Sequence, residues 1–272
     1  MKKHSPSELK TIARQCRIDI VQMLAAAGSG HTGGSLSSID LLVVLYFNIL
    51  NHDPNHPSWP ERDYFILSAG HLCPALYAVM AHAGYFPKET LMTLRQLGSP
   101  LQGHPSHIHL PGIETSTGSL GQGINVGVGV ALGLKMEKKP NRTFVLMGDG
   151  EQEEGSVWEA AMAASHYKLG NLVGIVDLNG QQQNGPTKEI MDSSPLSAKY
   201  QAFGWDVIEC NGNDIQEVLD VFAAVRFGNR PTVILAKTTM GKGVPAWEND
   251  YSWHGKAPKK EEVEESLRSI KG

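Results

Sequence analysis

The chain contains 272 residues, of which 41% are hydrophobic and 19% are charged, and its formal net charge is −4. A chain of this length and apolar content can bury a large core, so a globular protein is expected. The slightly acidic balance argues against a nucleic-acid-binding surface. The most apolar segment, residues 41–50, is roughly half of the ~20 residues that a membrane-spanning helix needs, so no membrane association is expected.

The cysteines and the N-terminus indicate where the protein resides. Cys16, Cys73 and Cys210 are scattered and form no C-x-x-C pair, which favours neither a disulfide framework nor a cysteine zinc site. The basic start of the chain is not followed directly by an apolar run, so no secretory signal is expected. A cytoplasmic location is therefore predicted.

The first half of the chain is predicted to be mostly helical around one short strand. Apolar residues at helical spacing mark the first helix, for which Ser7 is the expected N-cap. The segment 98–123 is rich in Gly, Pro, Ser and Thr, and its length is typical of a functional loop. The elements expected before it are a helix over 8–27, a break over 28–34, a helix containing 41–50, a strand over 64–68, and helices near 74–84 and 88–97.

The second half alternates strands with helices. Such alternation predicts an α/β fold, with a parallel sheet covered by helices on both faces. No linker or repeat interrupts the pattern, so one domain spanning residues 1–272 is expected. The expected strands are 143–147, 172–178, 205–210 and 232–238, and the helices are 155–167, 195–203, 214–226 and a charged C-terminal helix.

One helix, expected to follow the long loop, carries small residues on a single face. Gly123, Gly127 and Ala131 recur every four residues, which allows another backbone to approach closely. This face is a candidate for contact with another subunit, and packing inside the same chain is the alternative.

The stretch FVLMGDGEQEEG, residues 144–155, ends an apolar strand in a turn of the kind that cradles phosphate, yet it carries four carboxylates. A divalent cation between Asp149 and a phosphate would remove this conflict. Asn179 follows the next strand, so both side chains are expected at the same edge of the sheet. Magnesium prefers six oxygen ligands, which Asp149, the Asn179 amide, the Gln181 carbonyl, a diphosphate and water could supply. The alternative is that both segments are ordinary turns.

The pattern GDG followed by Asn resembles the magnesium-diphosphate motif of thiamine-diphosphate enzymes, and its surroundings resemble the transketolase family. Four further segments are similar to transketolase motifs and occur in the same order. They are SGHTGG at 29–34, LSAGHLCPALY at 67–77, QGHPS with TSTGSLGQG at 102–123, and HGKAP at 254–258. The resemblance covers nearly the whole chain and is much more specific than GDG alone.

The resemblance implies a cofactor and a metal. Thiamine diphosphate and Mg²⁺ are expected, with Ca²⁺ or Mn²⁺ able to substitute for Mg²⁺. Asp149, Asn179 and the Gln181 carbonyl are the implied metal ligands. The implied cofactor-binding residues are His71, Gly118, Leu120, Gly121, Gly148, Asp149, Gly150, Asn179 and Gln181.

The resemblance also implies which residues assist the chemistry. His31, His104 and His254 would line the sugar channel and move protons, work that suits neutral imidazoles. Glu154 matches a glutamate associated with a proton link between paired active sites. Glu151 has no such match, nor does Glu153, and both are expected to be solvated charges near a helix N-terminus.

Three positions depart from the family pattern. Thr32 stands where proline is common, which affects the presentation of His31. Tyr251 replaces a frequent histidine, and Gln181 replaces an apolar residue but keeps the backbone carbonyl that is the expected ligand.

The resemblance extends only to the diphosphate-binding domain of a transketolase. The pyrimidine-binding domain, which carries the glutamate that activates the cofactor, and the C-terminal domain have no counterpart in these residues. A split transketolase is therefore expected, in which a partner chain supplies both domains and much of the sugar-phosphate site. The expected assembly is an α2β2 heterotetramer that transfers a two-carbon ketol unit from a ketose phosphate to an aldose phosphate.

Three other functions are weighed against this one. An alpha-type subunit of a 2-oxo acid dehydrogenase also carries GDG, but the segments QGHPS, TSTGSLGQG and HGKAP argue against it. A non-catalytic regulatory relative is disfavoured because the metal ligands and channel histidines are present. A nicotinamide-dependent dehydrogenase is disfavoured because GSLGQG is not G-x-G-x-x-G and follows no strand.

Overall fold

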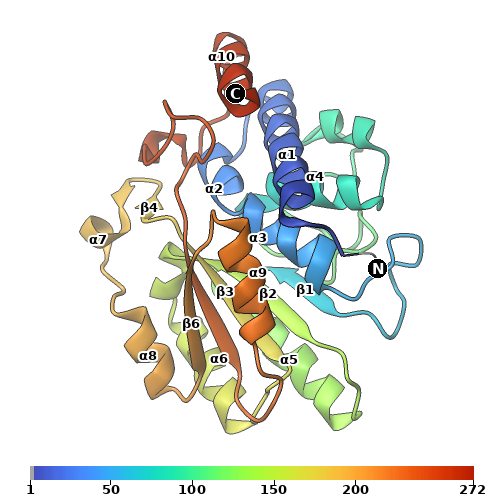
Figure 1. Cartoon of the computed structure of the whole chain (residues 1–272), viewed down its shortest axis with the longest axis vertical. Coiled ribbons are helices and arrows are strands. Elements are labelled where there is room, and N and C mark those ends of the chain that lie inside the picture. Colours follow the sequence, from blue (N-terminus) through green and yellow to red (C-terminus); the bar gives the residue numbers. More distant parts are fainter. Residues whose placement is uncertain (1–2) are drawn as a thin grey trace.

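Figure 1 shows the computed structural model, which describes residues 3–272. Met1 and Lys2 belong to the N-terminal segment that was expected to carry no secretory signal, and they lie outside the described residues. Five strands form one sheet in the order β1-β2-β3-β7-β6, and each neighbouring pair is parallel. The predicted α/β class with a parallel sheet is confirmed. The strands are β1 Tyr64–Leu67, β2 Thr143–Gly148, β3 Leu172–Leu178, β6 Asp206–Asn211 and β7 Thr232–Lys237, and a separate antiparallel pair consists of β4 Gln181–Gln182 and β5 Gly185–Pro186.

Helices cover both faces of this sheet (Figure 1). In β2, Phe144 and Leu146 contribute to the core shared with α1, α3, α4 and α9, whereas Val145 and Met147 contribute to the core shared with α5, α6 and α8. Successive side chains of a strand point to opposite faces, so a continuous apolar run fills both cores. The α-helices are α1 Pro6–Ala27, α2 Thr32–Ser37, α3 Ile39–Val44, α4 Cys73–Ala83, α5 Gln122–Met136, α6 Gly155–His166, α7 Thr187–Ile190, α8 Leu196–Ala202, α9 Ile215–Ala224 and α10 Lys260–Lys271.

The first helix begins earlier than predicted. Ser5 is its N-cap: the Ser5 hydroxyl accepts from the Glu8 backbone N–H at 3.3 Å, and the Glu8 carboxylate accepts from the Ser5 N–H at 2.7 Å. The expectation that Ser7 caps the helix is therefore wrong. Pro6 explains the difference, because its fixed φ and missing N–H suit the first helical position. Gly28 ends the helix with φ of 65°, a left-handed conformation that favours glycine.

Two other helical predictions change in detail. The helix expected to contain 41–50 is divided between two elements: α3 ends at Val44, and the π-helical turn η1 Leu45–Ile49 follows it directly. The segment 88–97 forms only the 3₁₀ helix η3 Lys88–Thr93. The remaining short 3₁₀ segments are η2 Gly70–Leu72, η4 Gly150–Glu153 and η5 Tyr251–Trp253.

The small-residue face of α5 lies against the chain's own sheet. A Cβ atom added to Gly123 would lie 2.6 Å from the Ser68 Cα, and one added to Gly127 would lie 2.5 Å from the Val145 Cγ2. Ala131 is fully buried in the same core. The candidate subunit contact on this face is therefore wrong, because the glycines allow the helix to approach β1 and β2.

The state of the cysteines and the length of the apolar helices can be compared with the sequence predictions. Cys16, Cys73 and Cys210 are buried free thiols. Across residues 3–272, no helix is both long and apolar enough to cross a membrane.

Candidate active site

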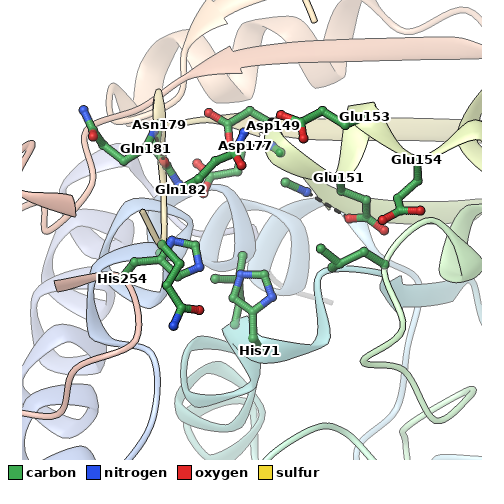
Figure 2. Close-up of a pocket in the computed structure, with 16 residues that line it drawn as sticks. His71, Asp149, Glu151, Glu153, Glu154, Asp177, Asn179, Gln181, Gln182 and His254 are labelled. Atoms are coloured by element: carbon green, nitrogen blue, oxygen red, sulfur yellow. Dashed lines mark hydrogen bonds between the residues drawn. The ribbon is translucent and has the colours of Figure 1, made fainter. Parts of the chain in front are cut away.

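The predicted metal ligands converge where β2 and β3 end. Gly148 pairs with Asp177 in the sheet, so Asp149 follows one strand and Asn179 follows its neighbour at the same edge. Together with Gln181 on β4, both residues line a pocket of about 270 Å³ (Figure 2). Carboxyl ends of parallel strands meet at one edge of a sheet, which explains why residues distant in sequence come together.

Asp149 is buried and surrounded by donors. Its carboxylate accepts hydrogen bonds from the Gly150 N–H at 2.8 Å, the Gly180 N–H at 2.7 Å and the Thr187 hydroxyl at 3.2 Å. Burial and the nearby Asp177 carboxylate raise the pKa of Asp149 to about 6. Two acidic side chains crowded in a low-dielectric site favour a cation between or beside them.

A buried network of polar side chains holds Asn179. The Asp177 carboxylate, 0% exposed, accepts from the Ser37 hydroxyl at 2.6 Å, from the Asn179 amide nitrogen at 3.1 Å and from the Thr238 hydroxyl. The Asn179 Oδ1 accepts from the Gln181 N–H at 3.0 Å. With its NH₂ group directed to Asp177, the Asn179 amide presents only oxygen on its other side. The acidic end of the apolar strand LVGIVDL was a signal for Asp177 that the sequence interpretation missed.

The donor set fits a hard cation such as Mg²⁺. Asp149 and Asn179 offer carboxylate and amide oxygens, which are ligands that Mg²⁺ prefers. Within the part of the chain that the structure describes, no three His, Cys, Asp or Glu side chains group in a way that could hold a metal on their own. For such a cation, further ligands would have to come from amide and carbonyl oxygens or from the bound ligand. The Gln181 side-chain oxygen is also buried in this pocket and has no hydrogen-bond partner.

Three histidines cluster beside this pocket, and two of them, His71 and His254, line it. His71 and His254 lie opposite Asp149 and Asn179 (Figure 2). Ring centroids are 5.0 Å apart for His31 and His71, 5.4 Å for His71 and His254, and 5.7 Å for His31 and His254. The three histidines come from distant parts of the chain, so the fold assembles the cluster.

The surroundings of the cluster keep its imidazoles neutral. Burial, the first cause, and neighbouring histidines lower the pKa of His31 to about 4 and that of His71 to about 3. Burial also lowers the pKa of His254, although a hydrogen-bonding interaction with the Gln181 backbone raises it in part. The Nδ1 atoms of His31 and His254 are buried without a hydrogen-bond partner, so they are available to a ligand. Neutral rings can both donate and accept protons there.

The glycine turn before α5 packs against the histidine side. Gly118 has φ of 148°, and a Cβ atom added to it would lie 3.0 Å from the His104 ring. Gly121 has φ of 76° and is the N-cap of α5, and Leu120 lines the pocket. His104 is more exposed than the other three histidines. Partial burial is the main cause that lowers the pKa of His104, and the positive charge of Arg95 lowers it further. His104 therefore lies at the outer side of the cluster.

The four carboxylates of the stretch at residues 144–155 have different environments. Glu154 is exposed at the pocket edge and is the N-cap residue of α6. Glu151 is 1% exposed, so its expected place as a solvated charge is wrong. Glu153 is half-buried and accepts a hydrogen bond from the Gln182 amide. The 3₁₀ turn η4 places both residues before α6, which is why they are not surface charges on its first turn.

The structure gives a role to one departure from the family pattern and a location to another. Thr32 is fully buried, and its hydroxyl donates to the Lys256 carbonyl at 2.6 Å, which ties the His31 loop to the segment that carries His254. Tyr251 is 45% exposed in η5.

This fold, with an acidic strand-end pocket facing histidines, defines a thiamine-diphosphate-binding domain. The family model "Transketolase, thiamine diphosphate binding domain" matches residues 8–272. The chain therefore belongs to the transketolase family, and the resemblance inferred from its motifs is confirmed.

Relatives of similar length are single subunits of transketolases by name. The chain is 43% identical over 252 residues to an apulose-4-phosphate transketolase subunit of Phocaeicola vulgatus, covering 92% of this chain and 89% of that protein. It is 43% identical over 235 residues to a 6-deoxy-6-sulfo-D-fructose transketolase subunit of a Clostridium species, covering 86% of each. The expected transketolase-type transferase subunit is confirmed by these relatives.

The chain is also similar to one part of longer transketolases. The crystal structure of transketolase from Campylobacter jejuni superposes with a TM-score of 0.92 at 31% identity, covering 97% of this chain and 43% of that one. The chain therefore spans less than half of that transketolase.

Proposed function

We propose that this chain is the diphosphate- and metal-binding subunit of a split transketolase. The observation that carries the proposal is that Asp149 and an oriented Asn179 amide lie at one sheet edge and line a single pocket with His71. Asp149, Asn179 and the Gln181 carbonyl would hold Mg²⁺, which in turn would hold the cofactor diphosphate. Residues 1–272 act as one diphosphate-binding domain of a cytoplasmic enzyme.

Thiamine diphosphate supplies the electron sink on which a two-carbon ketol unit passes between sugars. The chain's own residues bind the cofactor and handle protons around the sugar. His71 contacts the diphosphate, while Gly118, Leu120 and Gly121 hold the middle and ring side of the cofactor. Further such contacts come from Gly148 and Gly150.

The remaining histidines act on the substrate. His31 and His254 offer unpartnered Nδ1 atoms to sugar hydroxyls, and His104 extends the channel outward. Because burial keeps His31 neutral at physiological pH, its ring can accept a proton from one hydroxyl or donate one to a carbonyl oxygen. Glu154, exposed at the pocket edge, contributes a proton link toward a second active site.

A second, different chain completes the site. Two relatives of similar length, from Phocaeicola vulgatus and Actinobacillus succinogenes, each bear the name of one subunit of an apulose-4-phosphate transketolase, and the same division is proposed here. The partner carries the pyrimidine-binding domain with the activating glutamate and the C-terminal domain, in a heterotetramer with two copies of each chain. Native mass spectrometry of the co-purified complex tests this stoichiometry, and a one-to-one complex would contradict it.

The metal assignment is tested by calorimetry on the complex with and without Mg²⁺. Asp149→Ala is expected to abolish Mg²⁺-dependent binding of thiamine diphosphate, because it removes the only acidic ligand proposed. Asp220→Asn, an exposed change on α9, is the control and is expected to bind normally. Unchanged affinity in Asp149→Ala would contradict the assignment.

The split-enzyme proposal is tested by activity. The purified chain alone is expected to be inactive, and addition of the partner is expected to restore ketol transfer. Transfer by this chain without a partner would rule the proposal out. A donor panel with xylulose 5-phosphate, other ketose phosphates, a sulfonated ketose, and pyruvate with lipoamide identifies the donor, and activity only with pyruvate would favour the 2-oxo acid dehydrogenase alternative.

A further inference from the structure

Glu151 is a buried carboxylate at the junction of three chain segments. Its side chain lies in η4, directly after the Asp149 turn, and the residue is 1% exposed. Its carboxylate accepts hydrogen bonds from the Ser68 hydroxyl, from the Gly121 N–H at 2.8 Å and from the Gly148 N–H at 3.1 Å. Figure 2 shows Glu151 beside Glu154, on the pocket side that also carries Asp149.

The three donors belong to the three segments that meet around the pocket. Ser68 directly follows β1 and precedes the turn that presents His71. Gly121 is the N-cap of α5 at the end of the glycine turn. Gly148 is the last residue of β2, immediately before Asp149. A single side chain therefore connects the histidine segment, the glycine turn and the metal turn.

The Glu151 carboxylate is buried among these neutral donors and has no cation beside it among the described residues, so the donors offset its burial only in part. Among residues 3–272, no ion pair involves this carboxylate. Burying a carboxylate without a cation is costly, and neutral donors compensate only in a fixed arrangement. Each of the three donors must therefore keep its position for the carboxylate to remain buried.

We propose that Glu151 is a positioning residue that fixes the three cofactor-binding segments relative to one another. This inference rests on the proposed function, because it assigns the residue a task in cofactor binding. Gly121 adopts φ of 76° and is crowded, since an added Cβ atom would lie 2.8 Å from the Glu154 Cβ. The hydrogen bond to Glu151 holds this turn in the conformation that approaches the cofactor.

The acceptor geometry predicts that glutamine cannot replace Glu151. Oε1 accepts from both Ser68 and Gly121, while Oε2 accepts from Gly148. Glutamine has one oxygen, so its NH₂ group would face a backbone N–H donor in either orientation. Glu151→Gln keeps the volume of the side chain, replaces one acceptor oxygen by an NH₂ group and removes the negative charge.

The test uses the full chain assembled with its partner subunit. In Glu151→Gln, the dissociation constant of Mg²⁺–thiamine diphosphate is expected to rise at least tenfold. The cofactor KM is expected to rise with it, whereas kcat at saturating cofactor changes by less than about threefold. The matched control is Glu137→Gln, whose side chain is 62% exposed and which should bind the cofactor like the wild type. Wild-type affinity in Glu151→Gln would overturn the inference.

Amide hydrogen exchange on the chain without cofactor gives a second readout. The Gly121 and Gly148 amides are expected to exchange faster in Glu151→Gln than in Glu137→Gln, and equal exchange would overturn the inference. If the wild type failed to bind thiamine diphosphate, the proposed function would fail, yet exchange would still decide whether Glu151 holds the two amides. If Glu151→Gln failed to fold, Ser68→Ala would replace it, with an expected two- to fivefold loss of cofactor affinity, and no loss would overturn the inference.

Discussion

The Asp177 carboxylate determines which atom Asn179 presents to the pocket. The Asn179 Nδ2 donates to the Asp177 Oδ2 at 3.1 Å, so the amide oxygen is the only acceptor on the opposite side. Ser37 and Thr238 hold the same carboxylate from other directions. Partners behind a ligand orient it and commonly affect metal affinity as much as tenfold or more. Asp177 is thus positioned to prepare an oxygen ligand for a cation.

Asp177→Asn is expected to weaken Mg²⁺-dependent cofactor binding by about tenfold, because the single oxygen of asparagine cannot accept from Ser37, Asn179 and Thr238 together and so holds the Asn179 amide less firmly. Burial raises the pKa of Asp177, so its ionised form destabilises the ligand-free protein at neutral pH. Without ligand, the variant is therefore expected to be at least as stable to denaturant as the wild type. Calorimetry and urea unfolding check both points. If Asp177→Asn lost much stability without ligand but kept normal cofactor affinity, Asp177 would have only a structural role.

Acid is expected to destabilise the chain through its buried histidines. The pKa values of His31 and His71 are about 4 and about 3 in the folded protein, below the ordinary value of 6.5. The unfolded chain therefore takes up protons first, so this stability is complete above pH 6.5 and is lost as the pH falls below it. One such group changes the unfolding free energy by at most about 1.4 kcal/mol per pH unit.

Urea unfolding between pH 7.5 and 5 measures this slope. His31→Gln is expected to reduce the slope by about one proton, whereas His166→Gln, an exposed change at the end of α6, is expected to leave it unchanged. An identical slope in His31→Gln and the wild type would contradict the assignment of a neutral buried ring.

Two glycines of α5 are expected to respond oppositely to alanine. Gly127→Ala places a Cβ atom 2.5 Å from the Val145 Cγ2 and should destabilise the chain by about 1–3 kcal/mol. Gly133→Ala meets nothing within 4 Å and should stabilise it by roughly 0.5–1 kcal/mol through helix propensity. Denaturant unfolding of both variants compares them directly. A loss of stability in Gly133→Ala as large as that in Gly127→Ala would contradict the packing described for this helix.

The buried Arg17–Asp40 ion pair joins α1 to α3. The two hydrogen bonds measure 3.1 and 2.6 Å, and Asp40 also accepts from the Asn213 amide at 3.0 Å. Arg17→Met is expected to cost about 3–5 kcal/mol, because it leaves a buried carboxylate without its cation. Adding Asp40→Asn should recover part of that loss in denaturant unfolding.

The exposed Arg268–Glu264 pair is the matched control for this ion pair. Its side chains are 73% and 81% exposed, so Arg268→Met should change stability by less than about 1 kcal/mol. Equal losses in Arg17→Met and Arg268→Met would show that burial does not determine the strength of the Arg17 pair.

Much of the architecture could be predicted because it depends on short-range patterns. Apolar runs of strand length and helical periodicity located β1, β2, β3, β6 and β7 within a residue or two. The parallel arrangement then predicted that Asp149 and Asn179 share a sheet edge, which the register of Gly148 with Asp177 confirms. The motif histidines were found by resemblance, and their ring contacts show that His31, His71 and His254 gather.

Other features depend on how segments pack and could not be predicted in this way. Glu151 and Glu153 look equivalent along the chain, but the 3₁₀ turn buries the first against Gly121 and leaves the second half-buried. The small-residue face of α5 was compatible with two kinds of contact, and only the position of β1 and β2 showed that it is internal.

The sequence by itself determined the order of strands and helices along the chain, the motif positions and the chemical types of the residues proposed to bind the metal. Local propensity, periodicity and strand-end geometry act over short distances and are encoded in neighbouring residues. Only the tertiary structure decided which carboxylates lose water, which atom of Asn179 is presented, and which helix face is covered. These outcomes depend on hydrogen bonds and contacts between residues that are far apart in the chain, such as Ser37 with Asp177 and Ser68 with Glu151.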